Sequence, residues 1–127
     1  MLKIAICDDE KIFAEKIKEL LEVYLDSKHI AREINIYTSG IDFVALGENV
    51  MEYDIAFLDI KDMNGIQTAD KIRVYSQDIY IAFVTAYINY APEGYRCNAI
   101  RYILKNSNQL AASIYECMDA ILDKISS

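Results

Sequence analysis

The sequence predicts an α/β fold, in which a five-stranded, doubly wound parallel sheet carries helices on both faces. Short runs rich in β-branched and other apolar residues recur along the 127-residue chain, and segments with apolar residues at helical spacing separate them. Most of these runs lack the polar alternation of a half-exposed strand, which is typical of strands covered on both faces. With four Gly and one Pro the chain offers no linker, so residues 1–127 are expected to form one domain.

The expected strands follow the apolar runs in chain order. They cover residues 2–7, 34–37, 53–58, 79–84 and 100–104. The second and fifth runs keep some alternation of polar and apolar residues, which predicts that these two strands lie at the edges of the sheet.

The expected helices lie between these strands. The clearest cover residues 13–25 and 110–125, where apolar residues repeat at helical spacing. Weaker patterns predict helices at 41–46, 66–75 and 87–95. Gly40, Gly65 and the Asn-Ser-Asn segment at 106–108 mark element boundaries.

The alternation of strands and helices implies right-handed crossovers between parallel strands. Five strands connected in this way commonly take the order 2-1-3-4-5, which is the flavodoxin-like arrangement. Ligands of such folds bind beyond the carboxyl ends of the strands, near the point where the strand order reverses. Functional residues are therefore expected directly after the strands.

Charge and composition exclude several classes of protein. Thirteen basic and twenty acidic residues give a net charge of −7, and no basic run marks a surface for nucleic acid or for an anionic membrane. The longest uncharged run, 79–92, is too short to span a bilayer, and no signal peptide is visible, so a cytoplasmic location is expected. Three cysteines without a CxxC pair predict neither disulfides nor a zinc site; Cys7 and Cys117 are interpreted as small core residues.

Polar residues follow four of the expected strands: Asp8 and Asp9 after the first, Asp59 after the third, Thr85 after the fourth and Lys105 after the fifth. Each has an ordinary explanation, because aspartates favour helix N-termini, threonine caps helices and lysine is commonly solvated. The predicted strand order nevertheless brings all five to one crevice. Two like charges about 4 Å apart repel by about 4 kcal/mol at an effective dielectric constant of about 20, so such a cluster needs a metal cation, an ammonium group or a shared proton.

The chemistry of these side chains indicates which cation the crevice would hold. Carboxylate oxygens without His or Cys favour a hard ion such as Mg²⁺, which keeps water or phosphate oxygens as its remaining ligands. Lys105 adds a positive charge on the other side of the crevice. Together these groups suit the handling of a phosphoryl group.

The motifs at the strand ends resemble the receiver domain of bacterial two-component response regulators. The resemblance covers nearly the whole chain and rests on the segments 6–10 (ICDDE), 57–60 (FLDI), 64–66 (NGI), 83–86 (FVTA) and 101–105 (RYILK). The string Thr85-Ala86-Tyr87, followed by Tyr90-Ala91 and Tyr95, is most similar to receivers of the LytR/AlgR type. Those receivers usually precede a C-terminal DNA-binding domain of the LytTR kind, which the 127 residues do not include.

The resemblance implies that Asp59 accepts a phosphoryl group from a sensor histidine kinase or from a small donor such as acetyl phosphate. It further implies a Mg²⁺ site made by Asp8, Asp9, Asp59 and the backbone carbonyl of Lys61. The domain would thus catalyse its own phosphorylation and dephosphorylation without being a turnover enzyme in the usual sense.

The resemblance also implies a switch. Lys105 would pair with one phosphoryl oxygen, and the hydroxyl of Thr85 would donate to another. Movement of Thr85 would let Tyr102 rotate inward and reshape the face formed by the helix at 87–95, the strand at 100–104 and the last helix. In the family this face forms homodimers or contacts effectors that control transcription. An ordinary edge-strand aromatic is the alternative interpretation of Tyr102.

Two departures from the family pattern leave alternatives open. The loop after Asp59 is about two residues short and lacks its proline, and Asn106 stands where a proline usually follows the lysine. These changes motivate the first alternative, a receiver-like interaction module that is not phosphorylated. A flavodoxin-like FMN carrier would need a Ser/Thr/Gly-rich cradle where the acidic residues stand. A haloacid dehalogenase-type phosphatase would need a second aspartate at the position of Lys61.

Overall fold

The computed structural model describes residues 1–59, 63–86 and 97–126. A five-stranded sheet has the order β2-β1-β3-β4-β5, and every pair of neighbouring strands is parallel, as predicted. The strands are β1 (Leu2–Cys7), β2 (Arg32–Tyr37), β3 (Ile55–Leu58), β4 (Tyr80–Thr85) and β5 (Ala99–Leu104). The helices are α1 (Lys11–Ser27), α2 (Gly40–Val44), α3 (Met63–Tyr75) and α5 (Leu110–Ser126), with a 3₁₀ helix η1 (Gly47–Glu52).

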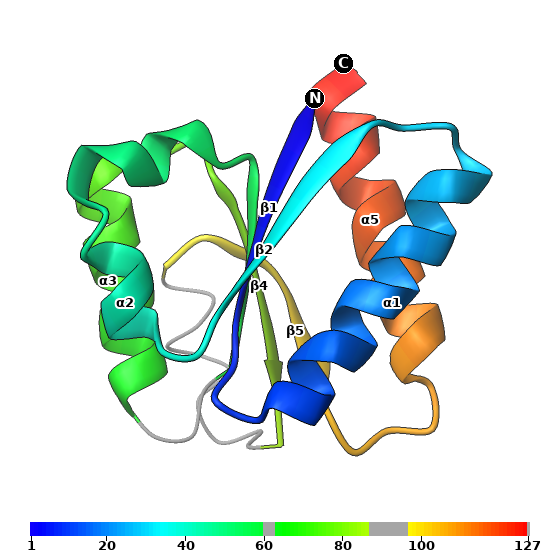
Figure 1. Ribbon diagram of the computed structural model, residues 1–127, viewed down its shortest axis with the longest axis horizontal. Coiled ribbons are helices and arrows are strands. Elements are labelled where there is room, and N and C mark those ends of the chain that lie inside the picture. The colour runs from blue at the N-terminus through cyan, green and yellow to red at the C-terminus, as the bar shows by residue number, and fades with distance from the viewer. Residues whose placement is uncertain (60–62, 87–96, 127) are drawn as a thin grey trace.

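The helices cover both faces of the sheet (Figure 1), with α1 and α5 on one side and α2 and α3 on the other. Each layer encloses a core. The core under α1 and α5 contains buried Ile4, Ile6, Leu21, Ile114 and Ile121, among others. The core under α2 and α3 includes Ala5, Phe43, Leu58, Ile72 and Phe83. Successive β1 residues thus point to opposite cores, which is the arrangement that continuous apolar strands predict.

The element boundaries agree with the sequence prediction to within three residues, and one of the differences has a clear local cause. β3 begins at Ile55, two residues later than predicted, because Tyr53 closes the 3₁₀ turn of η1 through a hydrogen bond to the Val50 carbonyl. No pattern in the sequence predicted η1. The predicted helix at 87–95 lies outside the described residues.

Helix α1 ends in a Schellman motif built on a left-handed residue. His29 has φ 57°, and its N–H donates to the Asp26 carbonyl, while the Ile30 N–H donates to the Leu25 carbonyl. This motif satisfies two carbonyls of the last turn and directs the chain into β2. Glycine is the usual residue at such a position, since a side chain strains the left-handed backbone.

The predicted core role of two cysteines is confirmed, and Cys97 is a third buried cysteine. Burial, followed by the charge of Asp8, raises the pKa of Cys7 well above its ordinary value. Burial raises the pKa of Cys117 to about 12. Both thiols therefore stay protonated and act as apolar side chains near neutral pH.

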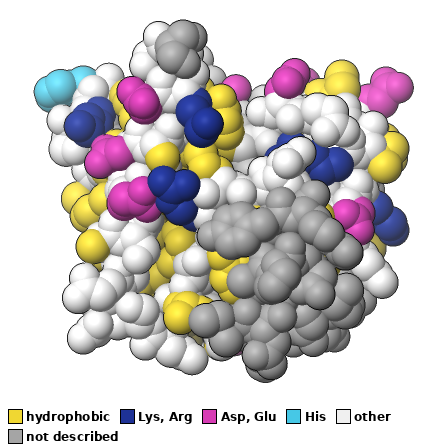
Figure 2. Space-filling model, turned by 180° about the vertical axis from the view of Figure 1, so that it is seen from behind, with side chains coloured by type: hydrophobic (Ala, Val, Ile, Leu, Met, Phe, Trp, Pro, Cys, Tyr) yellow, Lys and Arg dark blue, Asp and Glu magenta, His cyan; other side chains and the backbone are white. Residues whose placement is uncertain are grey.

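The surface carries charges of both signs. Figure 2 shows basic side chains lying beside acidic ones on the visible face. Of the helices that the structure describes, none combines the length and the apolar character needed to cross a membrane.

Candidate functional site

The carboxyl ends of β1 and β3 bring two predicted acidic residues together. Cys7 of β1 pairs with Leu58 of β3, so Asp8 and Asp59 leave neighbouring strands at the same level. The Asp59 N–H donates to the Cys7 carbonyl at 3.0 Å, which fixes this alignment. Asp8 Oδ1 accepts a hydrogen bond of 2.9 Å from the Glu10 N–H, which turns the chain toward α1.

Lys105 enters the same crevice from the end of β5. Its N–H donates to the Thr85 carbonyl at 2.7 Å, which continues the β4–β5 pairing by one residue. Its Nζ atom lies 2.9 Å from Oδ2 of Asp8, 3.2 Å from Oδ2 of Asp59 and 3.7 Å from Oε1 of Glu10. The ammonium also lies 4.4 Å from the centre of the Phe13 ring. One cation thus connects three acidic residues that are far from it in sequence.

Burial makes these charges strongly interdependent. The side chains of Asp8, Asp59 and Lys105 are only 1%, 7% and 5% exposed. Burial and the negative charge of Asp8 raise the pKa of Asp59, and Lys105 offsets these effects only in part. Burial would lower the pKa of Lys105, but its ion pairs with Asp8 and Asp59 outweigh that cost, so this pKa is raised. Lys105 is therefore cationic at neutral pH.

The same cluster fits a divalent cation. One carboxylate oxygen from each of Asp8, Asp9 and Asp59 lies within 4.8 Å of the others. Oδ2 of Asp8 is fully buried and has no hydrogen bond of good geometry among the described residues, although the Lys105 ammonium is near. Such an oxygen has a lone pair available for a metal, and an all-oxygen donor set suits Mg²⁺. The predicted fourth ligand, the carbonyl of Lys61, lies outside the described residues.

A hollow of about 380 Å³ opens beside the acidic cluster. Its walls come from the ends of β1 and β3, from the start of α2 and from α3; they include Thr38, Ser39, Gly40, Gln67, Thr68 and Lys71. These wall residues were not among the predicted site residues. The strand-end rule applied to the residues after β2 would have found Thr38 and Ser39, whereas the α3 residues have no comparable signal.

The comparisons with known proteins agree with this geometry. The family described as "Response regulator receiver domain" matches residues 4–114 of the chain. The chain belongs to this family. It is a receiver domain of two-component response regulators, as the motifs at the strand ends predict.

Two curated relatives of this receiver domain are proteins named LytT and LytR. The sensory transduction protein LytT of Bacillus cereus is 33% identical over 109 residues, which cover 83% of this chain and 42% of LytT. The transcriptional regulatory protein LytR of Staphylococcus aureus is 34% identical over 119 residues, which cover 85% of this chain and 43% of LytR. The chain thus spans about two fifths of the length of these relatives.

Solved structures show the same fold. The response regulatory domain of mrkE from Klebsiella pneumoniae has a TM-score of 0.79 at 23% identity, covering 97% of both chains. The CheY-like receiver domain protein from Methanospirillum hungatei has a TM-score of 0.78 at 22% identity, covering 98% of this chain and 95% of its own. The BeF3-activated DrrB receiver domain has a TM-score of 0.76 at 21% identity, covering 97% of this chain and 98% of its own.

The two predicted switch residues of the receiver domain lie on its last two strands. Thr85 is the final residue of β4, one residue beyond the predicted strand, and its side chain is fully buried. Tyr102 on β5 is half-buried, and its ring centre lies 5.8 Å from that of Phe83 on β4. Thr85 therefore lies at the end of the sheet that carries the acidic cluster, and Tyr102 packs on β4 from β5.

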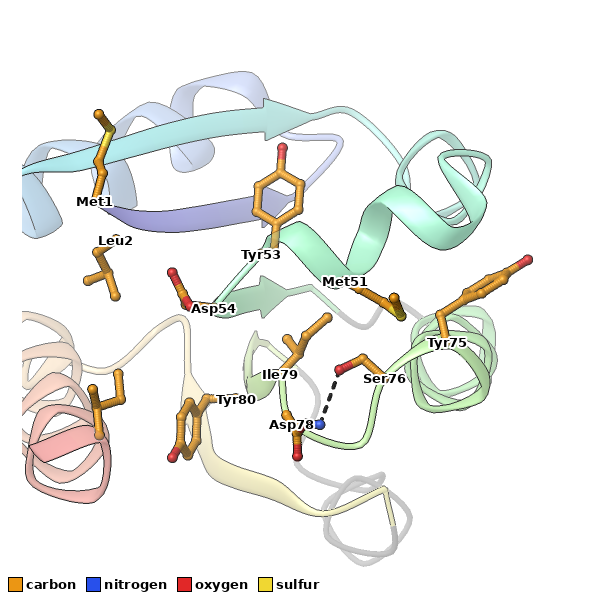
Figure 3. A pocket seen from close by; sticks show the side chains of 11 residues that line it. Met1, Leu2, Met51, Tyr53, Asp54, Tyr75, Ser76, Asp78, Ile79 and Tyr80 are labelled. Atoms are coloured by element: carbon orange, nitrogen blue, oxygen red, sulfur yellow. Dashed lines mark hydrogen bonds between the residues drawn. The ribbon is translucent and has the colours of Figure 1, made fainter. Parts of the chain in front are cut away.

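A second hollow, of about 490 Å³, lies at the other end of the sheet (Figure 3). It is lined by the starts of β1 and β4 and by the ends of η1, α3 and α5; the labelled residues include Leu2, Met51, Asp54, Tyr75 and Ile79. None of the predicted site residues borders it. Its size alone therefore does not connect it with phosphoryl chemistry.

Proposed function

We propose that this receiver domain is a phosphorylation switch whose phosphoacceptor is Asp59. The observation that carries the proposal is the position of Lys105 Nζ, which lies 2.9 Å from Asp8 and 3.2 Å from Asp59. A buried cation between two buried carboxylates is expensive to desolvate, so its presence needs a reason. Binding of a negatively charged phosphoryl group at this site would be such a reason.

In the proposed reaction, a carboxylate oxygen of Asp59 attacks phosphorus. The new P–O bond forms while the bond from phosphorus to the donor breaks: the P–N bond of phosphohistidine breaks and the histidine imidazole leaves, or the P–O bond of acetyl phosphate breaks and acetate leaves. The transition state is loose, and catalysis depends on position and on electrostatic stabilisation. Asp59 is suited to this step because its ion pair with Lys105 and the hydrogen bond from its N–H to the Cys7 carbonyl hold it at the strand end.

The side chains of Asp8, Asp9 and Asp59 and the carbonyl of Lys61 would hold Mg²⁺. When bound, this ion neutralises charge on the phosphoryl oxygens. Lys105 would then leave its resting ion pairs and contact a phosphoryl oxygen as a point charge. Asp9, the exposed member of the cluster, is placed where the ion can enter from solvent.

The proposed output runs through β4 and β5. The Thr85 hydroxyl would donate to a phosphoryl oxygen, and the space that it leaves would be filled by Tyr102. Phosphorylation would thereby alter the face formed by residues 87–95, β5 and α5. A second copy of the domain is the proposed partner of that face.

The relatives suggest the proposed phosphodonor, the cellular location and the output domain. A sensor histidine kinase is the proposed phosphodonor, and a cytoplasmic location is proposed for the reaction. Because the curated relatives are longer and one is named a transcriptional regulatory protein, we also propose that the domain controls a C-terminal DNA-binding domain of the LytTR kind. DNA contact would come only from that further domain.

Intact-mass measurement tests the proposal directly. After incubation with acetyl phosphate and Mg²⁺, the wild type is expected to gain one phosphoryl group, and Asp59→Asn is expected to gain none. Asp123→Asn, an exposed aspartate on α5, serves as a matched control and should behave like the wild type. If the wild type gains no mass and beryllofluoride causes no Mg²⁺-dependent change, the alternative of a non-phosphorylated interaction module replaces the proposal.

A further inference from the structure

A single arginine joins the starts of two strands at the end of the sheet opposite the acidic cluster. Arg73 lies in the last turn of α3. Its Nη1 donates to the Ile79 carbonyl at 2.7 Å, and its Nε donates to the Cys97 carbonyl at 2.8 Å. Weaker bonds of 3.4 Å and 3.2 Å reach the carbonyls of Ser76 and Asn98. One planar guanidinium thus holds four backbone acceptors in a fixed relation.

These acceptors lie directly before β4 and before β5. Ile79 precedes Tyr80, the first residue of β4, and Figure 3 shows the stretch from Ser76 to Tyr80 as it enters the sheet. Cys97 and Asn98 precede Ala99, the first residue of β5. Asn98 has φ 58°, so the turn into β5 has a strained left-handed residue.

A second contact from α3 holds the same turn. The Cys97 thiol donates to Oδ1 of Asp70 at 3.1 Å, and Asp70 precedes Arg73 by three residues on the helix. Two side chains on one face of α3 therefore contact the turn before β5.

The pairing of β4 with β5 is irregular next to this contact. Ile81 pairs with Ala99, but Ala82 pairs with Arg101, so Ile100 is an extra residue on β5. Beyond the irregularity the register continues without interruption to Thr85 and Leu104. The alignment of β4 with β5 at their carboxyl ends therefore depends on the position of the extra residue, Ile100, in β5.

This alignment decides where Lys105 points. A shift of one residue along a strand moves each side chain to the opposite face of the sheet. Such a shift would remove Lys105 from Asp8 and Asp59, about 20 Å along β5 from the turn that Arg73 holds.

We infer that Arg73 is a positioning residue for the phosphoryl site: it fixes the β4–β5 register at the strand starts and thereby places Thr85 and Lys105 at the strand ends. The positioning role rests on the proposed function, whereas the register role does not. Arginine suits this task better than lysine, because a single ammonium cannot reach carbonyls on both strands with the same geometry.

Amide hydrogen exchange measured by NMR tests the register role. The deciding quantity is the protection of the Lys105 N–H, which bonds to Thr85, relative to that of the Asp59 N–H, which bonds to Cys7. This ratio is expected to fall at least about tenfold in Arg73→Met and less in Arg73→Lys. The matched control is Arg32→Met, which removes ion pairs with Glu22 and Asp26 on the far side of the sheet and should leave the ratio unchanged.

Beryllofluoride titration with Mg²⁺ on the same variants tests the positioning role. An increase of about tenfold in the half-saturating concentration for Arg73→Met, together with the fall in protection, supports the inference. A fall in protection with unchanged titration overturns the positioning role. An unchanged protection ratio overturns the register role. Failure of both Arg73 variants to fold also overturns it, because the register role predicts a local change in β4–β5 pairing and not a loss of the whole fold. A wild type that does not bind beryllofluoride refutes the proposed function instead, and the exchange ratio still decides the register role.

Discussion

Gly40 and Thr68 lie so close together that a Cβ atom on Gly40 would stand 2.2 Å from Oγ1 of Thr68. The next nearest atoms, Cγ2 and Cβ of the same threonine, would be at 2.7 Å and 2.9 Å. Both residues line the hollow beside the acidic cluster. The start of α2 therefore approaches α3 closely only because residue 40 has no side chain.

Gly40→Ala is expected to lower the free energy of unfolding by about 1–3 kcal/mol, because a β-branched side chain cannot move aside easily. Urea titration measures the loss. Thr68→Ala removes two of the three clashing atoms, so the double variant should recover part of the stability lost in Gly40→Ala. Purely additive effects of the two substitutions would contradict this explanation.

Lys105→Met is expected to lower the stability of the metal-free domain by about 3 kcal/mol, since it leaves two buried carboxylates without their cation. Mg²⁺ should restore more stability to this variant than to the wild type, because the ion replaces the cation that Asp8 and Asp59 have lost. Thermal unfolding with EDTA and with excess Mg²⁺ measures both effects. Lys16→Met, at an exposed position on α1, is the control and should change little. Equal responses to Mg²⁺ would show that Lys105 and the ion do not share a site.

Asp59→Asn is expected to stabilise the metal-free domain at neutral pH. Burial and Asp8 raise the pKa of Asp59 in the folded state, so folding favours its protonated form. This contribution is fully present below the unfolded pKa of about 3.9 and is lost as the pH rises through the higher folded value. The stability advantage of Asp59→Asn over the wild type should therefore grow between about pH 4 and pH 7. Urea titrations in EDTA across this range measure the difference, and an advantage that shrinks with rising pH would contradict the electrostatic account.

His29→Gly is expected to stabilise the domain by about 1 kcal/mol, because the left-handed backbone at the end of α1 no longer carries a Cβ atom. Chemical denaturation with an unchanged m-value measures the gain. His29→Ala removes the imidazole but keeps the Cβ atom, so it should give no comparable gain. Equal stabilisation by both variants would mean that the imidazole, and not the backbone, is the source of the strain.

The site residues that the sequence predicts are those that directly follow β-strands. Asp8, Asp59 and Lys105 each follow a strand of a parallel sheet, and the carboxyl ends of parallel strands meet at one edge. The strand order then places the three residues together without any knowledge of side-chain conformation. Apolar runs likewise predict β1 and β3, since strands covered on both faces must be apolar.

The unpredicted parts depend on tertiary geometry. Gln67 and Lys71 border the hollow because of the way α3 lies on the sheet, and helical periodicity does not specify that placement. Arg73 escapes sequence reasoning for another reason: its partners are backbone carbonyls, which every residue provides. The short η1 helix has too few turns to show a periodic pattern.

The two outer strands have a consequence for self-association. At one margin of the sheet, Arg32 on β2 forms ion pairs with Glu22 and Asp26; at the other, Arg101 on β5 bonds to Glu116. Charged side chains on an outermost strand oppose the backbone-to-backbone joining of two sheets, which begins many forms of aggregation. Two copies of this domain are therefore expected to associate through side-chain contacts. Because their sheets do not join through backbone hydrogen bonds, this association should be reversible.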